Sequence, residues 1–422
     1  MQYRSTRNNT EPVGASDAIM QGLAPDGGLY IPESFPSLIH LPYGEISSYA
    51  ELAYEVLAPF FEGDELLADL AEICVEAFDF PVPLHPLSDE AMVLELFWGP
   101  TAAFKDFGAR FLASSMERIL AKRGEQLTIL VATSGDTGGA VAAAFAGKQR
   151  IRVKVLYPKG RVSARQQQQL TCWGGNIEAY EVDGSFDDCQ RMVKEAFMDK
   201  GLSMAHNLSS ANSINLGRLL PQSVYYVYAS QLYNGAYGKR PTIIIPSGNV
   251  GNATAAYWAF TMGAPIKEIA LAVNENRTIV DYLESGTYAG RASVQTLANA
   301  MDVGAPSNME RLFALYPTID EMRASLKAWS VSDAAIRETI GEVYRENGYI
   351  LCPHTATAER VRRDHFAGEG AIIVSTAHPA KFEETVEPLI GATVEVPPQL
   401  AALLDKKSEY QSIEADYRLL FG

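Results

Sequence analysis

The chain repeats one pattern: a short run of β-branched and other apolar residues, then a glycine-rich turn, then a helical stretch rich in small residues. One case is LTILVATSGDTGGAVAAAF at 127–145, and another is PTIIIPSGNVGNATAA at 241–256. Strands that alternate with helices in this way form parallel sheets that are covered by helices. The pattern therefore predicts an α/β fold.

The remaining strand patterns fall into two groups. Strands at 151–158 and 177–184 follow the first glycine turn, and strands at 266–273 and 371–376 accompany the second. We therefore expect two open, parallel-rich sheet units flanked by helices, together with an N-terminal segment. The predicted division is an N-terminal domain at 1–84, a small α/β domain at 119–212, and a large domain that combines 85–118 with 213–422.

The charge and composition of the chain argue against several classes of binding partner and of cellular location. A net charge of −16 over 422 residues argues against nucleic acid or an anionic membrane as a main partner. No apolar run approaches the roughly 18 residues that a membrane span needs, and MQYRSTRNNT lacks the apolar core of a secretion signal. The four cysteines are scattered, which favours reduced thiols in the cytoplasm. The six histidines are dispersed, so the sequence offers no metal motif.

One lysine stands in unusual surroundings. The stretch FWGPTAAFKDFGARF at 97–111 places Lys105 among Phe104, Phe107 and Phe111. Loss of hydration beside aromatic rings favours the neutral form of the amine. A neutral amine attacks aldehydes. We therefore expect Lys105 to carry a carbonyl cofactor.

The turn at 247–252 leads from a buried strand directly into a helix. Glycines let a ligand approach the backbone closely, and the start of a helix offers unpaired N–H groups to an anion. These features predict a phosphate cradle, although the same residues could also form only a tight turn. The candidate ligand-binding residues are Gly248, Asn249, Val250, Gly251 and Asn252.

A second turn, at 133–138, also opens a helix. Its hydroxyl and glycine residues could bind a carboxylate or a second phosphate. Ser, Asp and Thr are also ordinary helix N-caps, so the turn alone does not require a ligand. The candidate residues are Ser134, Gly135, Asp136 and Thr137.

A third strand ends within STAHPAKF at 375–382. Open α/β sheets bind ligands at such strand ends, where a hydroxyl of Ser375 or Thr376 could bond a heteroaromatic nitrogen. His378 and Lys381 could serve an anion or a proton, or could lie on an exposed loop. A lysine in apolar surroundings, a phosphate cradle and a hydroxyl at a third strand end are together the parts that pyridoxal phosphate needs.

These motifs together resemble those of the threonine synthase family, a branch of the pyridoxal-phosphate enzymes of fold type II, which share the tryptophan-synthase-β-like fold. The resemblance covers nearly the whole chain, and several motifs, notably the first and the last, are typical of threonine synthases rather than of the wider group. It implies a lyase of threonine biosynthesis that converts O-phospho-L-homoserine and water to L-threonine and phosphate. The motifs are YRSTRN, GLAPDGGLYIPE, GPTAAFKDFGARF, ATSGDTGGAVAAAF, NSINLGRLLPQ, PSGNVGNATAA and STAHPAKF.

The resemblance also implies roles for single residues. Lys105 would form the Schiff base with pyridoxal phosphate, and Thr376 would face the pyridine nitrogen. The loop 248–252 would hold the cofactor phosphate, and the loop 134–137 would take the substrate carboxylate. Related enzymes have asparagine in place of Asp136, so a contact with the ring hydroxyl is not implied here. The candidate cations for the substrate phosphate are Arg161, Arg218 and Lys381.

Other activities use the same motifs. A serine or threonine dehydratase, or a phospho-lyase of the same fold, would share both the lysine and the glycine loops. A catalytically silent regulator that binds an amino acid or phosphate is a third reading, against which the intact Lys105 argues. In each case we expect a small-molecule ligand and either a monomer or a homodimer.

Overall fold

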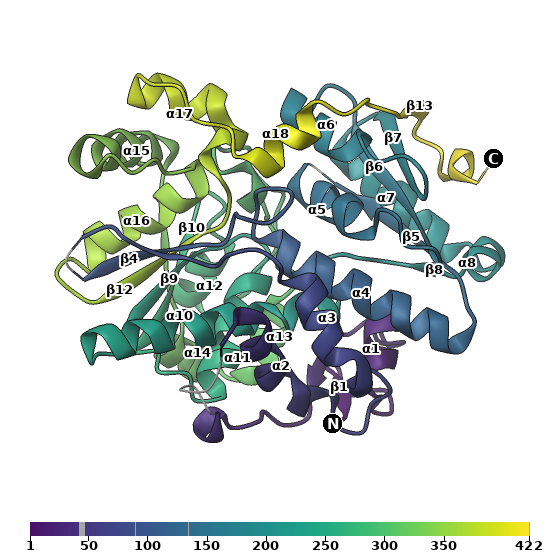
Figure 1. Cartoon of the computed structure of the whole chain (residues 1–422), viewed down its shortest axis with the longest axis horizontal. Coiled ribbons are helices and arrows are strands. Elements are labelled where there is room, and N and C mark those ends of the chain that lie inside the picture. Colours follow the sequence, from purple (N-terminus) through teal and green to yellow (C-terminus); the bar gives the residue numbers. More distant parts are fainter. Residues whose placement is uncertain (42–46, 89, 134, 422) are drawn as a thin grey trace.

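The computed structural model describes residues 1–41, 47–88, 90–133 and 135–421. Two sheets flanked by helices lie side by side and form most of the molecule (Figure 1). The predicted α/β fold with two mainly parallel sheets is confirmed. In the described part of the chain, no helix combines the length and the apolar character that a membrane span requires.

The six-stranded sheet occupies one side of the molecule. Its strand order is β11-β10-β9-β12-β4-β3, and only the pairing of β3 with β4 is antiparallel. Every residue of β4, β9 and β12 is buried, as expected for central strands of a sheet that is covered on both faces. The bounds are β3 Leu84–Pro86, β4 Ala91–Glu95, β9 Thr242–Pro246, β10 Glu268–Val273, β11 Lys327–Ser330 and β12 Ala371–Ser375.

Some helices of this unit pack against the sheet, and others pack against neighbouring helices. Helices α11 and α16 lie against its central strands. The long helix α10 begins after Pro221, and a separate short helix, α9, precedes it. The bounds are α9 Leu216–Leu219, α10 Gln222–Tyr237, α11 Gly251–Thr261, α12 Thr278–Ser285, α13 Met309–Leu315, α14 Ile319–Ser325, α15 Asp333–Asn347, α16 Pro353–His365 and α17 Glu383–Ile390, with short 3-10 turns at Asn299–Met301 and Pro379–Phe382.

The five-stranded sheet is parallel throughout and has the order β13-β7-β6-β5-β8. Capping boxes at Ser163 and Ser185 start two of its helices, since each serine accepts a backbone N–H bond from the third helical residue. The bounds are β5 Leu127–Ala132, α5 Asp136–Phe145, β6 Ile151–Pro158, α6 Ala164–Thr171, β7 Ile177–Asp183, α7 Phe186–Met198, α8 Lys200–His206, β8 Leu208–Ser209 and β13 Gln411–Glu414.

The N-terminal segment packs beside α4, the long helix that connects the two sheets. Its strands β1 and β2 form a small antiparallel pair. A tight turn lies before β2, where Gly27 has a φ of 79° and donates its N–H to the Ala24 carbonyl at 2.8 Å. The bounds are β1 Tyr3–Ser5, α1 Ala15–Gln21, β2 Tyr30–Pro32, α2 Tyr49–Leu57, α3 Leu70–Ala77 and α4 Lys105–Arg123, with 3-10 turns at Leu38–His40, Ala58–Phe61 and Leu67–Asp69.

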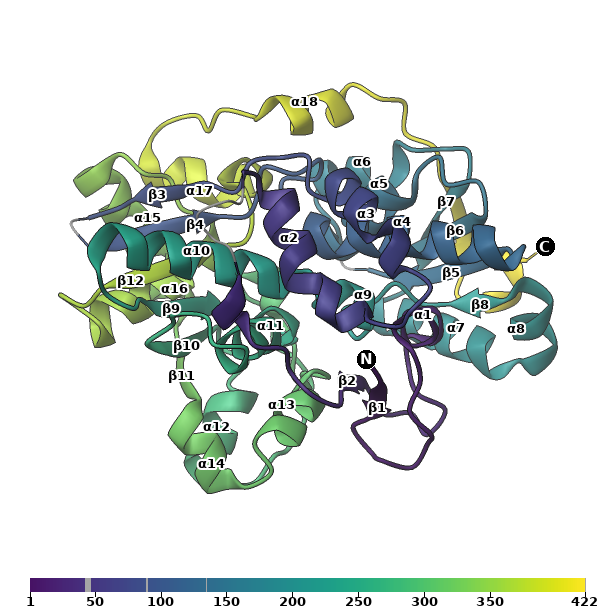
Figure 2. The same cartoon turned by 60° about the horizontal axis from the view of Figure 1, so that its bottom comes forward.

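The segment 391–410, here called the C-terminal strap, crosses from the six-stranded to the five-stranded sheet (Figure 2). It contains α18 (Pro398–Leu404), and a 3-10 turn at Tyr417–Leu420 follows β13. Gln168 Nε2 donates to the Leu403 carbonyl at 3.1 Å. β13 follows the strap and pairs in parallel with β7 at the edge of the five-stranded sheet. β13 is therefore a strand of the five-stranded sheet, although it lies within the segment 213–422.

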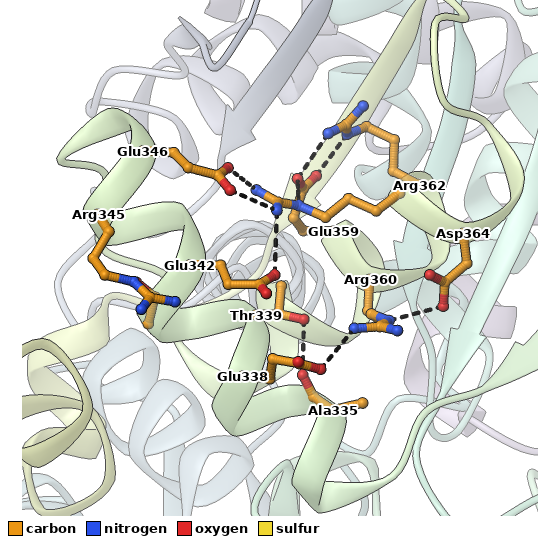
Figure 3. A network of polar contacts seen from close by, with 12 residues as sticks. Ala335, Glu338, Thr339, Glu342, Arg345, Glu346, Glu359, Arg360, Arg362 and Asp364 are labelled. Carbon is orange, nitrogen blue, oxygen red and sulfur yellow. Dashed lines mark hydrogen bonds and ion pairs between the residues drawn. The ribbon is translucent and has the colours of Figure 1, made fainter.

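Ion pairs connect α15 with α16 (Figure 3). The carboxylate of Glu359, which is fully buried, accepts bonds from Arg362 and from Arg363, both at 2.7 Å. Arg363 also reaches Glu346 on α15, at 2.6 Å. Arg363 is therefore bonded both to the buried Glu359 of its own helix and to Glu346 of α15.

Candidate active site

A cavity of about 380 Å³ lies where strand ends of the two sheets meet. Thr133 follows β5, Ser247 follows β9 and Thr376 follows β12, and all three line the cavity. The carboxyl ends of parallel strands are the usual ligand position in open α/β sheets. The predicted site residues in the cavity wall are Lys105, Asp136, Thr137, Arg218, Gly248, Asn249, Val250, Gly251, Asn252 and Thr376.

Lys105 is the first residue of α4 and is half-buried in this wall. The preceding Phe104 donates its backbone N–H to the Thr376 carbonyl at 2.8 Å, which ties the lysine to the end of β12. Burial lowers the pKa of Lys105 to about 8; Asp136 opposes this change, whereas Lys381 adds to it. A substantial share of the amine is therefore neutral near physiological pH.

The aromatic surroundings of Lys105 differ from the expected ones. Its Nζ lies 6.0 Å from the ring centroid of Phe104. Phe107 and Phe111 instead pack against Phe78 of the N-terminal segment, with ring centroids 6.0 and 6.2 Å apart. On a helix, residues two and six positions beyond Lys105 lie on other faces. The loss of hydration therefore comes from the buried cavity wall rather than from these two rings.

The glycine loop approaches its neighbours closely. A Cβ on Gly248 would lie 2.7 Å from Met301 Cα. Asn249 fixes the loop from both sides: its Nδ2 donates to Ser213 Oγ at 2.7 Å, and its Oδ1 accepts the Ser307 N–H at 2.6 Å. Val250 has a φ of 63° and is the N-cap residue of α11. This backbone is held in a conformation that L-residues rarely adopt, at the start of a helix.

Asn252 carries an unsatisfied donor in this loop. Its Oδ1 accepts a bond from the Tyr225 hydroxyl at 2.6 Å. Its Nδ2 is buried and has no hydrogen-bond partner in the described ranges of the chain. A buried donor without a partner costs about 1–3 kcal/mol unless a ligand satisfies it. Together with the start of α11, this amide suits an anion such as a phosphate.

The second loop is organised by Thr133. Its Oγ1 accepts N–H bonds from Gly135 at 3.0 Å and from Gly138 at 2.9 Å, which holds the start of α5. Gly135 has a φ of 142°, and a Cβ there would lie 2.5 Å from Gln166 Nε2. Asp136 and Thr137 line the cavity, whereas Gly135 lies behind them. The predicted Ser134 lies outside the described residues.

Of the three candidate cations, only Arg218 lines the cavity. It is 2% exposed, and its Nη1 donates to the Ala211 carbonyl at 2.6 Å. Burial lowers the pKa of Arg218 to about 10, with partial compensation by Asp106, so that the side chain stays charged at neutral pH. The wall therefore contains a buried guanidinium that is suited to an anionic ligand.

The other two candidate cations are not among the described residues that line the cavity. Arg161 is exposed in the turn after β6. Lys381 lies beneath the wall, where its Nζ forms an ion pair with Asp136 Oδ1 at 2.9 Å. Arg161 follows the end of β6 and Lys381 follows the end of β12. A position after a strand, however, does not determine the direction in which a side chain points.

His354 is a wall residue that the sequence analysis did not identify. It is the second residue of α16, is 2% exposed, and its Nε2 accepts the Ala300 N–H at 3.1 Å. Burial lowers the pKa of His354 to about 4; Asp136 opposes this, and Lys105 contributes to the lowering. The imidazole is therefore neutral at physiological pH. The only signal in the sequence was a Cys-Pro-His start to a helix.

The wall residues fit a cofactor that carries both an aldehyde and a phosphate. Lys105 supplies an amine that is partly neutral, and the loop at 248–252 supplies an unsatisfied donor beside a helix start. The hydroxyl residue Thr376, which directly follows β12, is buried in the same wall. Each part that pyridoxal phosphate needs is present in one cavity.

Comparison with family models places most of the chain in known families. Residues 82–376 match the model for pyridoxal-phosphate dependent enzymes. Residues 2–78 match the model of the threonine synthase N terminus, and residues 355–420 match that of the threonine synthase C-terminal region. The two threonine synthase models therefore match mainly the two ends of the chain, on either side of most of the region matched by the general pyridoxal-phosphate model.

Individual relatives agree with the family models. The chain is 38% identical to threonine synthase of Escherichia coli over 424 residues, which cover 100% of this chain and 98% of the relative. It is 40% identical to threonine synthase of Haemophilus influenzae over 402 residues, covering 95% and 94%. The crystal structure of pyridoxal-phosphate-bound threonine synthase from Brucella melitensis superposes with a TM-score of 0.95 at 36% identity, covering 100% of this chain and 98% of that one.

Proposed function

The chain belongs to the threonine synthase family of pyridoxal-phosphate-dependent enzymes, and from this premise we propose which of its residues carry the reaction. The family, the fold and the cofactor that the motifs predicted are confirmed. We infer that the substrate is O-phospho-L-homoserine and that the products are L-threonine and phosphate. The proposals that follow assign roles to the residues of the cavity wall.

We propose that Lys105 binds the cofactor covalently, that the loop 248–252 holds its phosphate, and that Thr376 faces its ring nitrogen. The unsatisfied Nδ2 of Asn252 supports the phosphate position. When bound, pyridoxal phosphate accepts into its conjugated ring the electrons that are released at the substrate α-carbon. A hydroxyl partner at the ring nitrogen, unlike a carboxylate, leaves that nitrogen largely unprotonated.

Lys105 is also the proposed general base. An amine whose pKa is about 8 both takes and returns protons near neutral pH, which is the condition for efficient acid–base catalysis. We assign to it the proton transfers at the α- and β-carbons of the substrate. The half-buried position of this side chain limits the access of bulk water to the amine. Phosphate leaves from the γ-carbon, a proton is added at that carbon, and water adds at the β-carbon.

The substrate carries two anionic groups that the wall must bind. The start of α5, at 135–137, is the proposed position of the substrate carboxylate, because a helix N-terminus attracts negative charge. Arg218 is the proposed partner of the substrate phosphate, since it is the candidate cation that lines the cavity. Arg161 and Lys381 are not proposed for this role.

The observation that carries the proposal is the meeting of Lys105, the glycine loop and Thr376 in one cavity. The test is to incubate the enzyme with O-phosphohomoserine and to measure both phosphate release and the organic product. We expect threonine rather than 2-oxobutyrate, and we expect Lys105→Ala to abolish turnover. Formation of 2-oxobutyrate would instead favour a dehydratase.

The role of Arg218 is tested in the same assay. A hydrogen bond to a charged group contributes roughly 1.5–3 kcal/mol, so Arg218→Met should lower kcat/KM about ten- to a hundred-fold at 1.36 kcal/mol per decade. The matched control is Arg161→Met, which removes an exposed arginine outside the cavity. Equal losses in both variants would argue against Arg218 as the phosphate partner.

We further propose a cytoplasmic enzyme that is a monomer or a homodimer. The four cysteines are free and buried, which suits a reducing compartment. The division into domains at 1–84, at 119–212, and at 85–118 with 213–422 remains a proposal. Light scattering of the purified protein tests the oligomeric state.

A further inference from the structure

A buried ion pair joins the two sheet units at the cavity wall, where Asp136 lines the cavity and Lys381 does not. Asp136 is the first residue of α5, and Lys381 lies in the 3-10 turn that follows β12. Their Oδ1 and Nζ atoms are 2.9 Å apart, and the side chains are only 4% and 2% exposed. Lys381 Nζ also donates to the Thr101 carbonyl at 2.9 Å, so that the ammonium is held from a second direction.

The pair sits in an environment of other charged and titratable groups. Lys105, Arg218 and His354 line the same cavity as Asp136. Asp106, on the other side of Thr101, accepts bonds from the Thr101 N–H at 2.8 Å and from its hydroxyl at 2.7 Å. The lining of the cavity contains two carboxylates, Asp136 and Asp302. Asp136 acts electrostatically on Lys105, and Lys381 is the cation that is paired with Asp136.

A carboxylate in this wall presents two difficulties. Beside Lys105 it favours the charged ammonium, which cannot act as a nucleophile or a base. It also repels the anionic groups of the substrate that the wall has to bind. Both effects weaken when the carboxylate is paired with a fixed cation. Removing one partner from such a buried pair leaves an uncompensated charge.

We propose that Lys381 is a positioning residue of the reaction: its ion pair with Asp136 compensates this carboxylate and keeps the Lys105 amine reactive at neutral pH. The proposal rests on the proposed function of Lys105. It is supported by geometry, and the electrostatics agree in direction, since Asp136 raises and Lys381 lowers the pKa of Lys105. The pair acts through Lys105 and need not contact the substrate.

The experiment compares wild type with Lys381→Met, Asp136→Asn and the double variant, each close in size to the native residue. Full-length protein stripped of cofactor is labelled competitively with acetic anhydride between about pH 6 and pH 10, a range chosen to bracket lysine titration. Mass spectrometry of the Lys105 peptide gives the pH at which half of the amine has become reactive. Pyridoxal phosphate rebinding is followed over the same range.

The expected shifts have opposite signs. Lys381→Met leaves Asp136 uncompensated, so the midpoint for Lys105 should rise by about one pH unit or more. Asp136→Asn leaves Lys381 uncompensated, so the midpoint should fall. The double variant should return toward wild type, because neither charge remains. Shifts of the same sign, or unchanged midpoints in both single variants, would overturn the proposal.

Lys154→Met is the matched control. Lys154 is also buried and forms an ion pair, with Glu178 at 2.6 Å between β6 and β7, but it does not line the cavity. We expect this variant to lower the melting temperature without moving the Lys105 midpoint. If wild type forms threonine while the predicted shifts are absent, only the positioning role fails. If Lys105→Ala retains activity, the proposed function itself fails.

Discussion

Val250 shows how the glycine loop stores strain. A β-branched residue with a φ of 63° lies in the left-handed region, which costs on the order of 1–3 kcal/mol. The two bonds of the Asn249 side chain, to Ser213 and Ser307, hold the loop in this shape. The N–H groups at the start of α11 are therefore arranged before any ligand arrives, which reduces the entropy cost of binding.

Gly248→Ala should weaken the binding of pyridoxal phosphate. The added Cβ would lie 2.7 Å from Met301 Cα, and because this neighbour is backbone, the loop itself has to move. Overpacking of this kind costs about 1–3 kcal/mol, which corresponds to roughly a five- to hundred-fold weaker affinity. Fluorescence titration of the cofactor-free enzyme measures the change.

Gly235→Ala is the control for this substitution. Gly235 lies within α10, and nothing is found within 4 Å of its added Cβ. Because alanine favours a helix over glycine, this variant should bind the cofactor normally and melt at the same or a higher temperature. If Gly248→Ala lost only global stability and kept its cofactor affinity, the glycine would serve packing alone.

Some residues of the cavity wall could be predicted from the sequence, because they belong to short motifs of neighbouring residues. Lys105 begins helix α4 and the loop 248–252 leads into α11, and at both places the local residue types already indicate the backbone and the chemistry. The charge partners could not be predicted, because the pairing of Asp136 with Lys381 joins two different sheet units. His354 was missed for the same reason: the start of α16 reaches the cavity only through the packing of that helix.

At the scale of elements, the buried carboxylate of Glu359 on α16 (Figure 3) is bonded to Arg363, which in turn pairs with Glu346 on α15. Glu359→Ala removes the acceptor of Arg362 and of Arg363. Loss of one partner from a buried network costs about 3–5 kcal/mol. We expect the lower end of this range, since Arg363 keeps its bond with Glu346. Urea unfolding followed by circular dichroism measures the loss.

Glu338→Gln offers a comparison on the same pair of helices. Glu338 pairs with Arg360 at 3.0 Å, but its side chain is 58% exposed. Exposed pairs contribute about 0–1 kcal/mol, so this variant should unfold at nearly the same urea concentration as wild type. A loss as large as that of Glu359→Ala would mean that burial does not determine the strength of this network.

The alternation of strand and helix could be read from the sequence because buried parallel strands are continuous apolar runs. Two edge strands could not be read in this way. β3 lies in the proline-rich stretch FPVPLHPL at 80–87, and an edge position tolerates its proline. In β13 only Ile413 is partly buried, so the segment has no hydrophobic pattern to reveal it. These two segments form strands because they pair with β4 and β7, and not because of a hydrophobic pattern of their own.

At the scale of the whole molecule, His354 predicts how stability depends on pH. Its pKa is about 4 in the folded protein and about 6.5 when unfolded. The unfolded chain therefore binds more protons between these values, and stability falls as the pH falls through this window. At 1.36 kcal/mol per pH unit the loss approaches about 3 kcal/mol at pH 4. Urea unfolding at several pH values measures it.

His354→Gln should remove this part of the pH dependence, because glutamine does not titrate and its side-chain oxygen can still accept the Ala300 N–H. His206→Gln is the control, since His206 is exposed. We expect the control to keep the slope of wild type between pH 4 and 6.5. An unchanged slope in His354→Gln would show that other groups govern acid unfolding.

The position of β13 has a consequence for the growing chain. Ser412 of β13 donates to Glu181 of β7 at 2.9 Å, and the two residues are 231 positions apart. At about 5–20 residues per second, the ribosome delivers β13 on the order of 10–50 s after β7. During this delay β7 is an open edge on which another nascent chain could pair. The acidic side chains of β7, at Glu178, Glu181 and Asp183, would face like charges in such a pairing, so that two unfinished chains repel each other until β13 arrives.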